Sequence, residues 1–340
     1  MTRDGAEATV RPVLDVRGLS VVYDGETPVR AVTDVSFTVR PGEILGLAGE
    51  SGCGKSTILS AIAQLNRPPA RTTAGSVLFG AGEGPPVDLL SLSQRELSAI
   101  RWEELAVVFQ SAMDALNPVT RLSTQFVDVL RLHRGLSRSA AKERAAELLG
   151  VVGIPASRLR SYPHELSGGM RQRATIALAL ACDPSIVLMD EPTTAVDVVM
   201  QRQILEQVTR LRRELGFAVV FVTHDMSLLL EIADRIAIMY AGRIVEMGAA
   251  SEIYRDPKHP YTKGLRDSFP PLSGPRREII GITGSPPDPR RLPSGCSFHP
   301  RCPEKVEACE KTRPPLLGDE RNVACLLHSP TSEEVVSVER

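Results

Sequence analysis

The sequence has no long hydrophobic segment, no secretory leader and no excess of charge of either sign. Its longest apolar runs, such as IALALAC and FAVVFV, fall far short of the ~20 residues that cross a bilayer. The first residues, MTRDGAEATVRPV, lack the apolar core of a signal peptide. The 40 basic and 41 acidic residues balance, so nothing indicates a nucleic-acid-binding surface. These absences predict a chain that stays in the cytoplasm, where disulfides are disfavoured.

The 340 residues are 42% hydrophobic and 24% charged, which is ordinary for a globular protein. Residues 13–48 alternate apolar and polar positions, which predicts antiparallel strands. Three short apolar segments, SIVLMD, FAVVFV and RIAIMY, alternate with helical patterns at 170–181, 199–215 and 226–233. Buried strands that alternate with helices predict a mainly parallel sheet of the α/β class.

Two further regions complete the predicted organisation. Residues 120–160 are helical, with Ala141, Ala145, Leu148, Leu149 and Val152 on one face. The segment AGRIVEMG predicts a hairpin at the sheet edge. After about residue 255 prolines accumulate, and we expect a separate, loop-rich extension. The predicted domains are therefore 13–255 and 256–340.

The segment GESGCGKST fits the phosphate-loop pattern G-x-x-x-x-G-K-[ST] and lies between an apolar strand, EILGLAG, and a helical segment, KSTILSAIAQL. Gly52 and Gly54 allow the backbone N–H groups to form an anion nest, and the helix adds its positive end. Lys55 is predicted to reach the β- and γ-phosphates, and Ser56 to hold Mg²⁺. The predicted nucleotide-binding residues of this segment are Gly49, Glu50, Ser51, Gly52, Cys53, Gly54, Lys55, Ser56 and Thr57.

The segment IVLMDEP ends a buried strand with two acids, Asp190 and Glu191. At the carboxyl end of a parallel strand such acids face the ligand crevice. Asp190 is predicted to bind Mg²⁺, and Glu191 to polarise the attacking water as general base. Alone, the pair would more often be a loop or capping feature; beside a phosphate loop it points to nucleotide hydrolysis.

The stretch ELSGGMRQR resembles the LSGGQ signature of ABC-transporter ATPases, and the three motifs have that family's order and spacing. Other family elements match residue by residue: Gln110 in VVFQ, Asp197 in TAVD, His224 in FVTHD and Tyr23 in LSVVYDG. Met170 replaces the usual glutamine of the signature and Val196 the usual leucine of the D-loop. We expect neither to impair activity.

The resemblance implies a RecA-like P-loop NTPase core, an antiparallel β subdomain, a helical subdomain at about 111–164 and the small C-terminal extension. It also implies ATP and Mg²⁺ as cofactors and ATP hydrolysis as the activity. Tyr23 would stack on adenine, Gln110 would contact Mg²⁺, and His224 the γ-phosphate. Ser167, Gly168, Gly169 and Asp197 would complete the phosphate cage of a facing ATPase domain, so hydrolysis would require closure.

Further segments, FQSAMDALNP, EPTTAVDVVMQRQIL, DPKHPYTKGL and GCSFHPRC, resemble the dipeptide, oligopeptide and nickel importers. The branch implies import of peptides, with two membrane permease subunits, a second ATPase (a paralogue rather than a copy), an extracytoplasmic solute-binding protein and no nucleic acid. It places the chain peripherally on the cytoplasmic membrane face. The alternatives are a nickel importer, a soluble ABC ATPase of DNA repair or translation, and a metal-sensing regulator.

Four of the six cysteines, Cys296, Cys302, Cys309 and Cys325, lie in the extension. The branch resemblance implies a [4Fe–4S] cluster there, and four thiols without close pairs suit one. Zinc, free thiols and a disulfide remain alternatives. Cys53 lies in the phosphate loop, where positive charge would lower its pKa and make it reactive. Cys182 is expected to be inert core.

Overall fold

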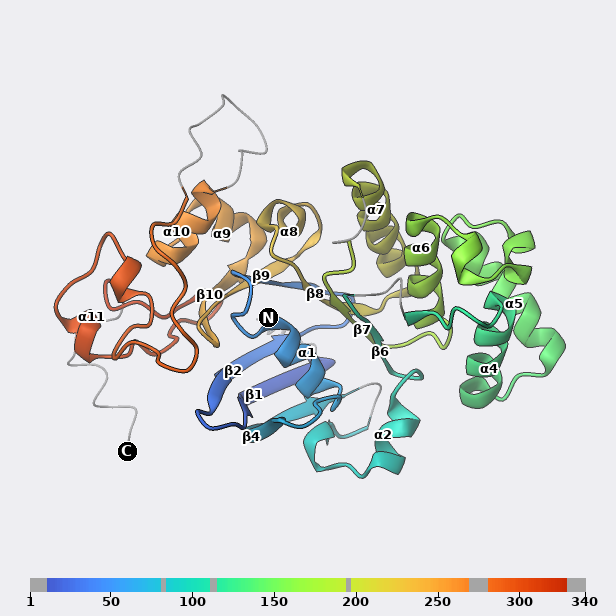
Figure 1. Cartoon of the computed structure of the whole chain (residues 1–340), viewed down its shortest axis with the longest axis horizontal. Coiled ribbons are helices and arrows are strands. Elements are labelled where there is room, and N and C mark those ends of the chain that lie inside the picture. The colour runs from blue at the N-terminus through green and yellow to red at the C-terminus, as the bar shows by residue number, and fades with distance from the viewer. Residues whose placement is uncertain (1–10, 81–83, 111–114, 194–196, 269–280, 329–340) are drawn as a thin grey trace, which may run out of the picture.

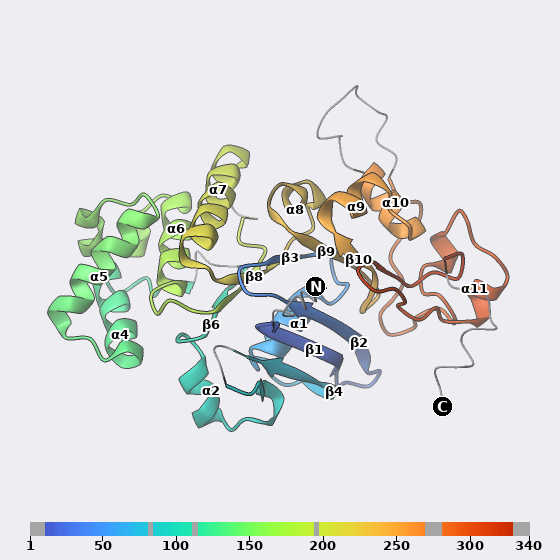
Figure 2. The ribbon, with the colours of Figure 1, turned by 180° about the vertical axis from the view of Figure 1, so that it is seen from behind.

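The computed structural model describes residues 11–80, 84–110, 115–193, 197–268 and 281–328. A central sheet carries α6 to α9 on one face, and α1 with a second sheet on the other (Figure 1). The view from behind shows α4 and α5 at one end of the molecule and the C-terminal extension, with α11, at the other (Figure 2). The phosphate loop therefore lies between two layers that are both anchored to the central sheet.

The central sheet has the strand order β11-β10-β9-β3-β8-β7-β6 in the part of the chain that is described. Pairing is parallel from β9 through β6, and antiparallel for β9 with β10 and for β10 with β11. The strands are β3 (Ile44–Ala48), β6 (Leu105–Val108), β7 (Ile186–Asp190), β8 (Ala218–Val222), β9 (Arg235–Tyr240), β10 (Arg243–Ala249) and β11 (Asn322–Val323).

Both faces of this sheet are buried, which explains why its strands are continuously apolar. Successive side chains of a strand point to opposite faces. Ile44 and Ala48 of β3 accordingly pack in the hydrophobic cluster under α6 to α8. Leu45 and Leu47 pack in the other cluster, with α1 and the second sheet.

The second sheet is antiparallel, with the strand order β2-β1-β4-β5. Its first two strands pair as the alternating sequence pattern predicts. Its strands are β1 (Leu14–Tyr23), β2 (Val29–Val39), β4 (Ala70–Phe79) and β5 (Val87–Asp88). Tyr23 at the end of β1 and residues 29–31 at the start of β2 line the same cavity as the phosphate loop, so this sheet supplies residues to the site.

The helices follow their capping signals. Asp197 caps α7 by accepting a hydrogen bond from the Met200 N–H at 3.0 Å, and Gly216 ends α7 in the left-handed conformation. Leu65, expected on the first helix, lies beyond its end. The helices are α1 (Lys55–Ile62), α2 (Gln94–Ile100), α4 (Leu122–Arg134), α5 (Arg138–Val151), α6 (Gly168–Ala179), α7 (Val198–Leu215), α8 (Met226–Ile232), α9 (Ala250–Arg255), α10 (Pro260–Asp267) and α11 (Ala308–Lys311).

The helical region pairs α4 with α5 and is joined to α6. The five apolar residues predicted for one face of the second helix are all buried; Val152 is its C-cap. Phe126 of α4 is fully buried in the same cluster. Amphipathic packing therefore holds this region together, as the periodicity predicts.

The C-terminal extension is attached to the core more closely than its composition indicates. The sequence predicted that the hairpin of β9 and β10 lies at the sheet edge, and this prediction is wrong. β11 of the extension pairs with β10 through Glu246 and Met247 and forms the edge instead. Arg321 pairs with Glu246 at 2.7 Å, and the Glu246 side chain is fully buried. The sequence could not indicate β11, because a strand of two residues shows no periodic pattern.

Aromatic rings provide the apolar part of this contact. Phe298 packs edge-on against Tyr240 of β9 and Tyr261 of α10, with ring centroids 5.2 and 5.4 Å away. All three rings are almost completely buried. Such edge-to-face pairs add to the stabilisation that burial alone gives.

Candidate functional site

The phosphate loop joins β3 to α1, in the strand–loop–helix context that its motif requires. Gly52 and Gly54 have φ angles of +78° and +104°, which favour glycine. A Cβ on Gly54 would also lie 2.2 Å from the Ala31 carbonyl oxygen. Gly54 is the N-cap of α1 and offers no capping side chain, so the first N–H groups of α1 remain available to a phosphate.

Lys55 and Ser56, the first residues of α1, bond to different parts of the site: Lys55 to the backbone of the phosphate loop and Ser56 to the end of β7. The buried Lys55 Nζ donates to the carbonyl oxygens of Gly49 at 2.7 Å and Glu50 at 3.0 Å. The Ser56 hydroxyl donates to Asp190 Oδ1 at 2.8 Å. Burial raises the pKa of the Asp190 carboxyl, although the Ser56 hydrogen bond opposes the rise. The structure thus brings together the two residues predicted to hold Mg²⁺, and their oxygen atoms are the ligand type that this ion prefers.

Glu191, which follows Asp190, contacts two other side chains that were predicted for the site. His224 Nδ1 and Gln110 Nε2 each lie 3.2 Å from Glu191 Oε2. Glu191 has a positive φ of 43°, and its N–H donates to the Val222 carbonyl at 2.9 Å. A non-glycine residue in this conformation is held there by its surroundings, and such strain is concentrated at functional sites.

A cavity of about 440 Å³ lies beside these residues, and Ser56, Gln110 and Glu191 line it. Asp190 and His224 are outside the lining and contact it through Ser56 and Glu191. Tyr23 lies on its wall, with its hydroxyl 3.2 Å from Thr57 Oγ1. The lining residues that belong to the predicted site are Tyr23, Ser51, Gly52, Cys53, Gly54, Lys55, Ser56, Thr57, Gln110 and Glu191. The volume and the mixture of polar groups with two aromatic rings, Tyr23 and Tyr240, suit a nucleotide.

The signature residues lie apart from this cavity. Ser167 caps α6 by accepting a hydrogen bond from the Met170 N–H at 3.3 Å, and Gly168 is the first residue of that helix. Gly169 is buried against Met200 of α7, where a Cβ would lie 2.1 Å from Met200 Cε. Asp197, at the start of α7, also lies outside the cavity lining that the described residues form. Thr194, Ala195 and Val196 of the D-loop fall outside the described residues.

Comparison with known proteins identifies the family. The family model for ABC transporters matches residues 32–194, and the model for the C-terminal region of oligopeptide/dipeptide transporters matches residues 245–309. A putative peptide import ATP-binding protein of Brucella melitensis is 47% identical over 318 residues, which cover 91% of this chain and 94% of that relative. The chain belongs to the ABC-transporter ATP-binding protein family.

Further relatives agree with this assignment. The oligopeptide transport ATP-binding protein OppD of Salmonella typhimurium is 42% identical, with 89% of each chain covered. A dimeric post-hydrolysis structure of the ATP-binding cassette MJ0796, bound to ADP and Pi, has a TM-score of 0.62 and 30% identity, and covers 70% of this chain and 98% of that one. The P-loop NTPase fold and the identification as an ABC-type ATPase, both inferred from the motifs, are confirmed. None of the helices that the structure describes has the length and apolarity to cross a membrane.

The interpretation of Cys53 as a low-pKa thiol is wrong. Lys55 Nζ lies 3.7 Å from its sulfur and lowers the pKa, but burial raises the pKa by more. The side chain is buried beneath the phosphate loop, so its thiolate is disfavoured. Cys182 is fully buried, and burial raises its pKa to about 11, in agreement with an inert core residue.

The four cysteines of the extension gather in one place but do not form a ligand set. The Cys296 N–H donates to the Cys309 carbonyl at 2.8 Å, which brings two of the segments together. Burial, and then the neighbouring cysteines, raise the pKa of Cys302 and raise that of Cys325 to about 11. Among the described residues, however, no three His, Cys, Asp or Glu side chains are arranged to hold a metal ion. The donor chemistry fits a cluster, whereas the arrangement in this structure does not.

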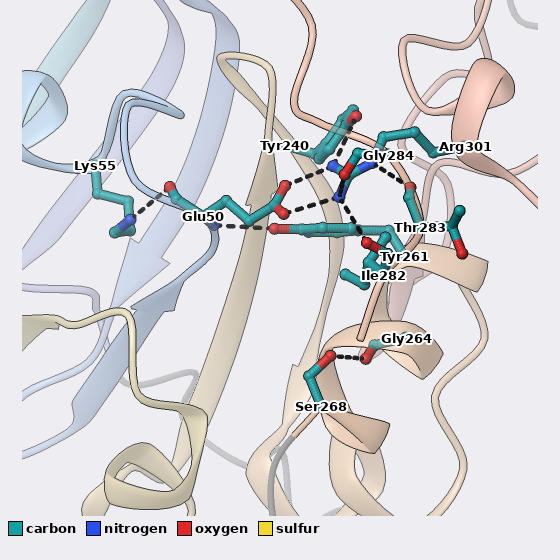
Figure 3. Close-up of polar contacts among 10 residues, drawn as sticks. All are labelled: Glu50, Lys55, Tyr240, Tyr261, Gly264, Ser268, Ile282, Thr283, Gly284 and Arg301. Atoms are coloured by element: carbon teal, nitrogen blue, oxygen red, sulfur yellow. Dashed lines mark hydrogen bonds and ion pairs between the residues drawn. The ribbon is translucent and has the colours of Figure 1, made fainter. Parts of the chain in front are cut away.

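Sequence reasoning missed the part of the site that the extension supplies. Pro286, Pro287, Pro289 and Leu292 line the cavity opposite Tyr23 and the loop. Arg301 pairs with Glu50 of the phosphate loop, as Figure 3 shows beside Lys55 and Tyr261. The proline cluster GSPPDP was visible in the sequence, but nothing local indicates which surface it covers.

Proposed function

We propose that this chain hydrolyses ATP to drive the import of di- or oligopeptides through separate membrane permease subunits. The observation that carries the proposal is the contact of Ser56 with Asp190, and of Gln110 and His224 with Glu191, beside the cavity that Ser56, Gln110 and Glu191 line together with the phosphate loop. Relatives named as peptide import ATP-binding proteins, which match almost the whole chain, support the choice of peptides.

The proposed roles follow from these positions. The loop residues Gly49 to Thr57 bind the phosphates, and Lys55 leaves its two carbonyl partners to reach the β- and γ-phosphates. Ser56, Asp190 and Gln110 hold Mg²⁺, which neutralises charge on the phosphates when it is bound. Glu191 accepts the proton of the attacking water, and His224 contacts the γ-phosphate. Tyr23 stacks on adenine.

A second ATPase subunit completes the site. Ser167, Gly168, Gly169 and Asp197 lie away from the cavity of their own chain, at the starts of α6 and α7, where Ser167 and Asp197 are exposed. A helix N-terminus attracts anions, so α6 of a facing subunit would suit the γ-phosphate. We propose a paralogous ATPase as this partner, as the resemblance to peptide importers implies. The intact motifs of this chain would supply at least one competent site with either a paralogue or a second copy.

The remaining partners belong to the importer. The proposed domains are an ATPase domain (13–255) and an extension (256–340). Within the ATPase domain, the helical subdomain at about 111–164 would contact the membrane subunits. Two permease subunits would bind there, with an extracytoplasmic solute-binding protein on the other side of the membrane. The chain would lie peripherally on the cytoplasmic face.

The test is ATP hydrolysis and uptake by the reconstituted transporter in proteoliposomes. Glu191→Gln is expected to lower hydrolysis and oligopeptide uptake at least about a hundredfold, because it removes the general base, while MgATP binding persists. Glu214→Gln, an exposed substitution on α7, is the matched control and should keep wild-type rates. Nickel uptake without peptide uptake would favour the nickel importer. ATPase activity without any association with permeases would favour the soluble class.

We further propose that Cys296, Cys302, Cys309 and Cys325 hold a [4Fe–4S] cluster. The support is four buried or partly buried thiols, of which Cys296, Cys302 and Cys325 have pKa values raised by burial and by neighbouring cysteines. Because the sulfurs are not arranged as ligands in this structure, the proposal requires the extension to adjust on loading. Anaerobic purification tests it: absorption near ~400 nm and about four irons per chain would support the cluster. One zinc, or no metal, would refute it.

A further inference from the structure

The guanidinium of Arg301, in the 3₁₀ turn His299–Arg301 of the extension, is buried against the phosphate loop (Figure 3). Its two terminal nitrogens donate to both carboxylate oxygens of Glu50, at 2.7 and 3.0 Å. Only 6% of the Arg301 side chain is exposed, against 25% of the Glu50 side chain. A two-pronged, desolvated pair of this kind is strong and fixes the orientation of both partners.

Every N–H of this guanidinium has an acceptor. Besides Glu50, Arg301 donates to the Tyr240 hydroxyl at 3.3 Å and to the carbonyls of Thr283 at 3.0 Å and Gly284 at 3.3 Å. The Glu50 hydrogen bond raises the pKa of Arg301, so the group stays charged. A guanidinium without a spare donor is not placed to bind a phosphate itself, and any effect on the nucleotide must pass through Glu50.

Glu50 in turn connects the extension to the phosphate-binding lysine. Its N–H donates to the Tyr261 hydroxyl at 2.9 Å, and its carbonyl accepts from Lys55 Nζ at 3.0 Å. The side chain, N–H and carbonyl of Glu50 are therefore all hydrogen-bonded. The partners of its side chain and N–H, Arg301 and Tyr261, both belong to the C-terminal extension. Displacement of Glu50 would move both the loop backbone and a partner of Lys55.

The charge of Glu50 gives this arrangement a second consequence. A carboxylate beside a site for a polyanion opposes binding unless its charge is neutralised. Arg301 neutralises Glu50, so the loop keeps its attraction for phosphates. Loss of Arg301 would leave a partly buried, unpaired carboxylate in the loop itself.

We infer that Arg301 is a positioning residue for nucleotide binding: through Glu50 it holds the phosphate loop in place and cancels a negative charge beside the phosphate site. This inference rests on the proposed ATP site. It assigns to the C-terminal extension a direct part in binding ATP, independent of any metal that the extension carries.

The experiment measures the Kd of MgATP by isothermal titration calorimetry on the purified full-length chain, and KM and kcat for hydrolysis on the reconstituted transporter that contains it. Arg301→Met is expected to weaken MgATP binding at least about tenfold and to raise KM similarly, with kcat changed less than about threefold. The double variant Arg301→Met/Glu50→Gln should recover part of the lost binding, because no unpaired charge remains, but not all of it, because the loop still lacks the two hydrogen bonds from Arg301. Arg301→Lys, which keeps the positive charge, should lose less than Arg301→Met.

The matched control is Arg321→Met, which breaks the other ion pair between extension and core, Arg321 with Glu246, far from the loop. It is expected to lower stability but to leave the Kd of MgATP within about threefold of wild type. If Arg301→Met does not fold, Arg301→Gln, which keeps a donor for the Thr283 carbonyl but no charge, takes its place.

Three results would overturn the inference: unchanged affinity in Arg301→Met or Arg301→Gln, an equal loss in Arg321→Met, or no recovery in the double variant. Failure of the wild-type chain itself to bind MgATP would instead refute the proposed function. The two failures are therefore distinguishable in one set of titrations.

Discussion

Acid should destabilise this protein through one buried histidine, His259, at the start of α10. The side chain is 1% exposed, and its Nδ1 accepts a hydrogen bond from the Tyr261 N–H at 3.0 Å. A protonated imidazole carries hydrogen on both nitrogens and would lose this bond. Burial, and then the charges of His328 and Lys263, lower the pKa of His259 from 6.5 to about 3.

The sign and size of the effect follow by linkage. Between pH 6.5 and about 3 the unfolded chain binds a proton at His259 that the folded chain does not, so the free energy of unfolding falls as the pH falls. At pH 5, one and a half units below the ordinary value and at 1.36 kcal/mol per unit, the loss is about 2 kcal/mol. Above pH 6.5 the histidine contributes no pH dependence.

The assay is urea denaturation followed by circular dichroism at pH 7 and pH 5. His259→Asn keeps an acceptor for the Tyr261 N–H but cannot titrate, so wild type should lose about 2 kcal/mol more than the variant over this range. His164→Asn, at an exposed position, should behave as wild type does. Equal losses in wild type and His259→Asn would refute the argument, since the buried imidazole would then not titrate as its surroundings dictate.

Two further substitutions test the site and the core. Gly54→Ala should abolish measurable MgATP binding in calorimetry, because φ is +104° and the new Cβ would meet the Ala31 carbonyl; Gly150→Ala, in α5 with open space around it, should bind normally and gain up to about 1 kcal/mol. Normal MgATP binding by Gly54→Ala would contradict this argument, because it would show that the phosphate loop can bind MgATP with a different backbone conformation at this position. Phe126→Ala should cost about 3–5 kcal/mol in urea denaturation, because this fully buried ring of α4 leaves a cavity; a cost below about 1 kcal/mol would mean that the helical region collapses around the gap.

The sequence predicted the parts of the site that depend on short segments. The phosphate loop, the acids after β7 and the helix start at Ser167 are each fixed by residues within about ten positions of one another, so strand, turn and cap signals suffice. The family resemblance, not the spacing, assigned Gln110 and His224 to the site, and their contacts with Glu191 became visible only in the structure. The catalytic roles of these residues stay predictions.

Contacts between distant segments could not be predicted. Tyr261 follows Glu50 by 211 positions and Arg301 follows it by 251, and neither position carries a periodic or motif signal that names its partner. The error at Cys53 has the same origin. Its neighbours in sequence are positively charged or polar, but burial by residues far along the chain dominates its pKa.

The boundary near residue 255, drawn from the change in composition, therefore does not separate two independent bodies. Two acids of the core, Glu50 and Glu246, have lost much or all of their solvent, and each is paired with an arginine of the extension. A buried carboxylate without a cation costs several kcal/mol, so these pairs form only because the extension is docked. One of the two acids lies in the phosphate loop. The proline-rich composition that suggests an independent appendage therefore belongs to a segment whose docking completes the electrostatics of the nucleotide site.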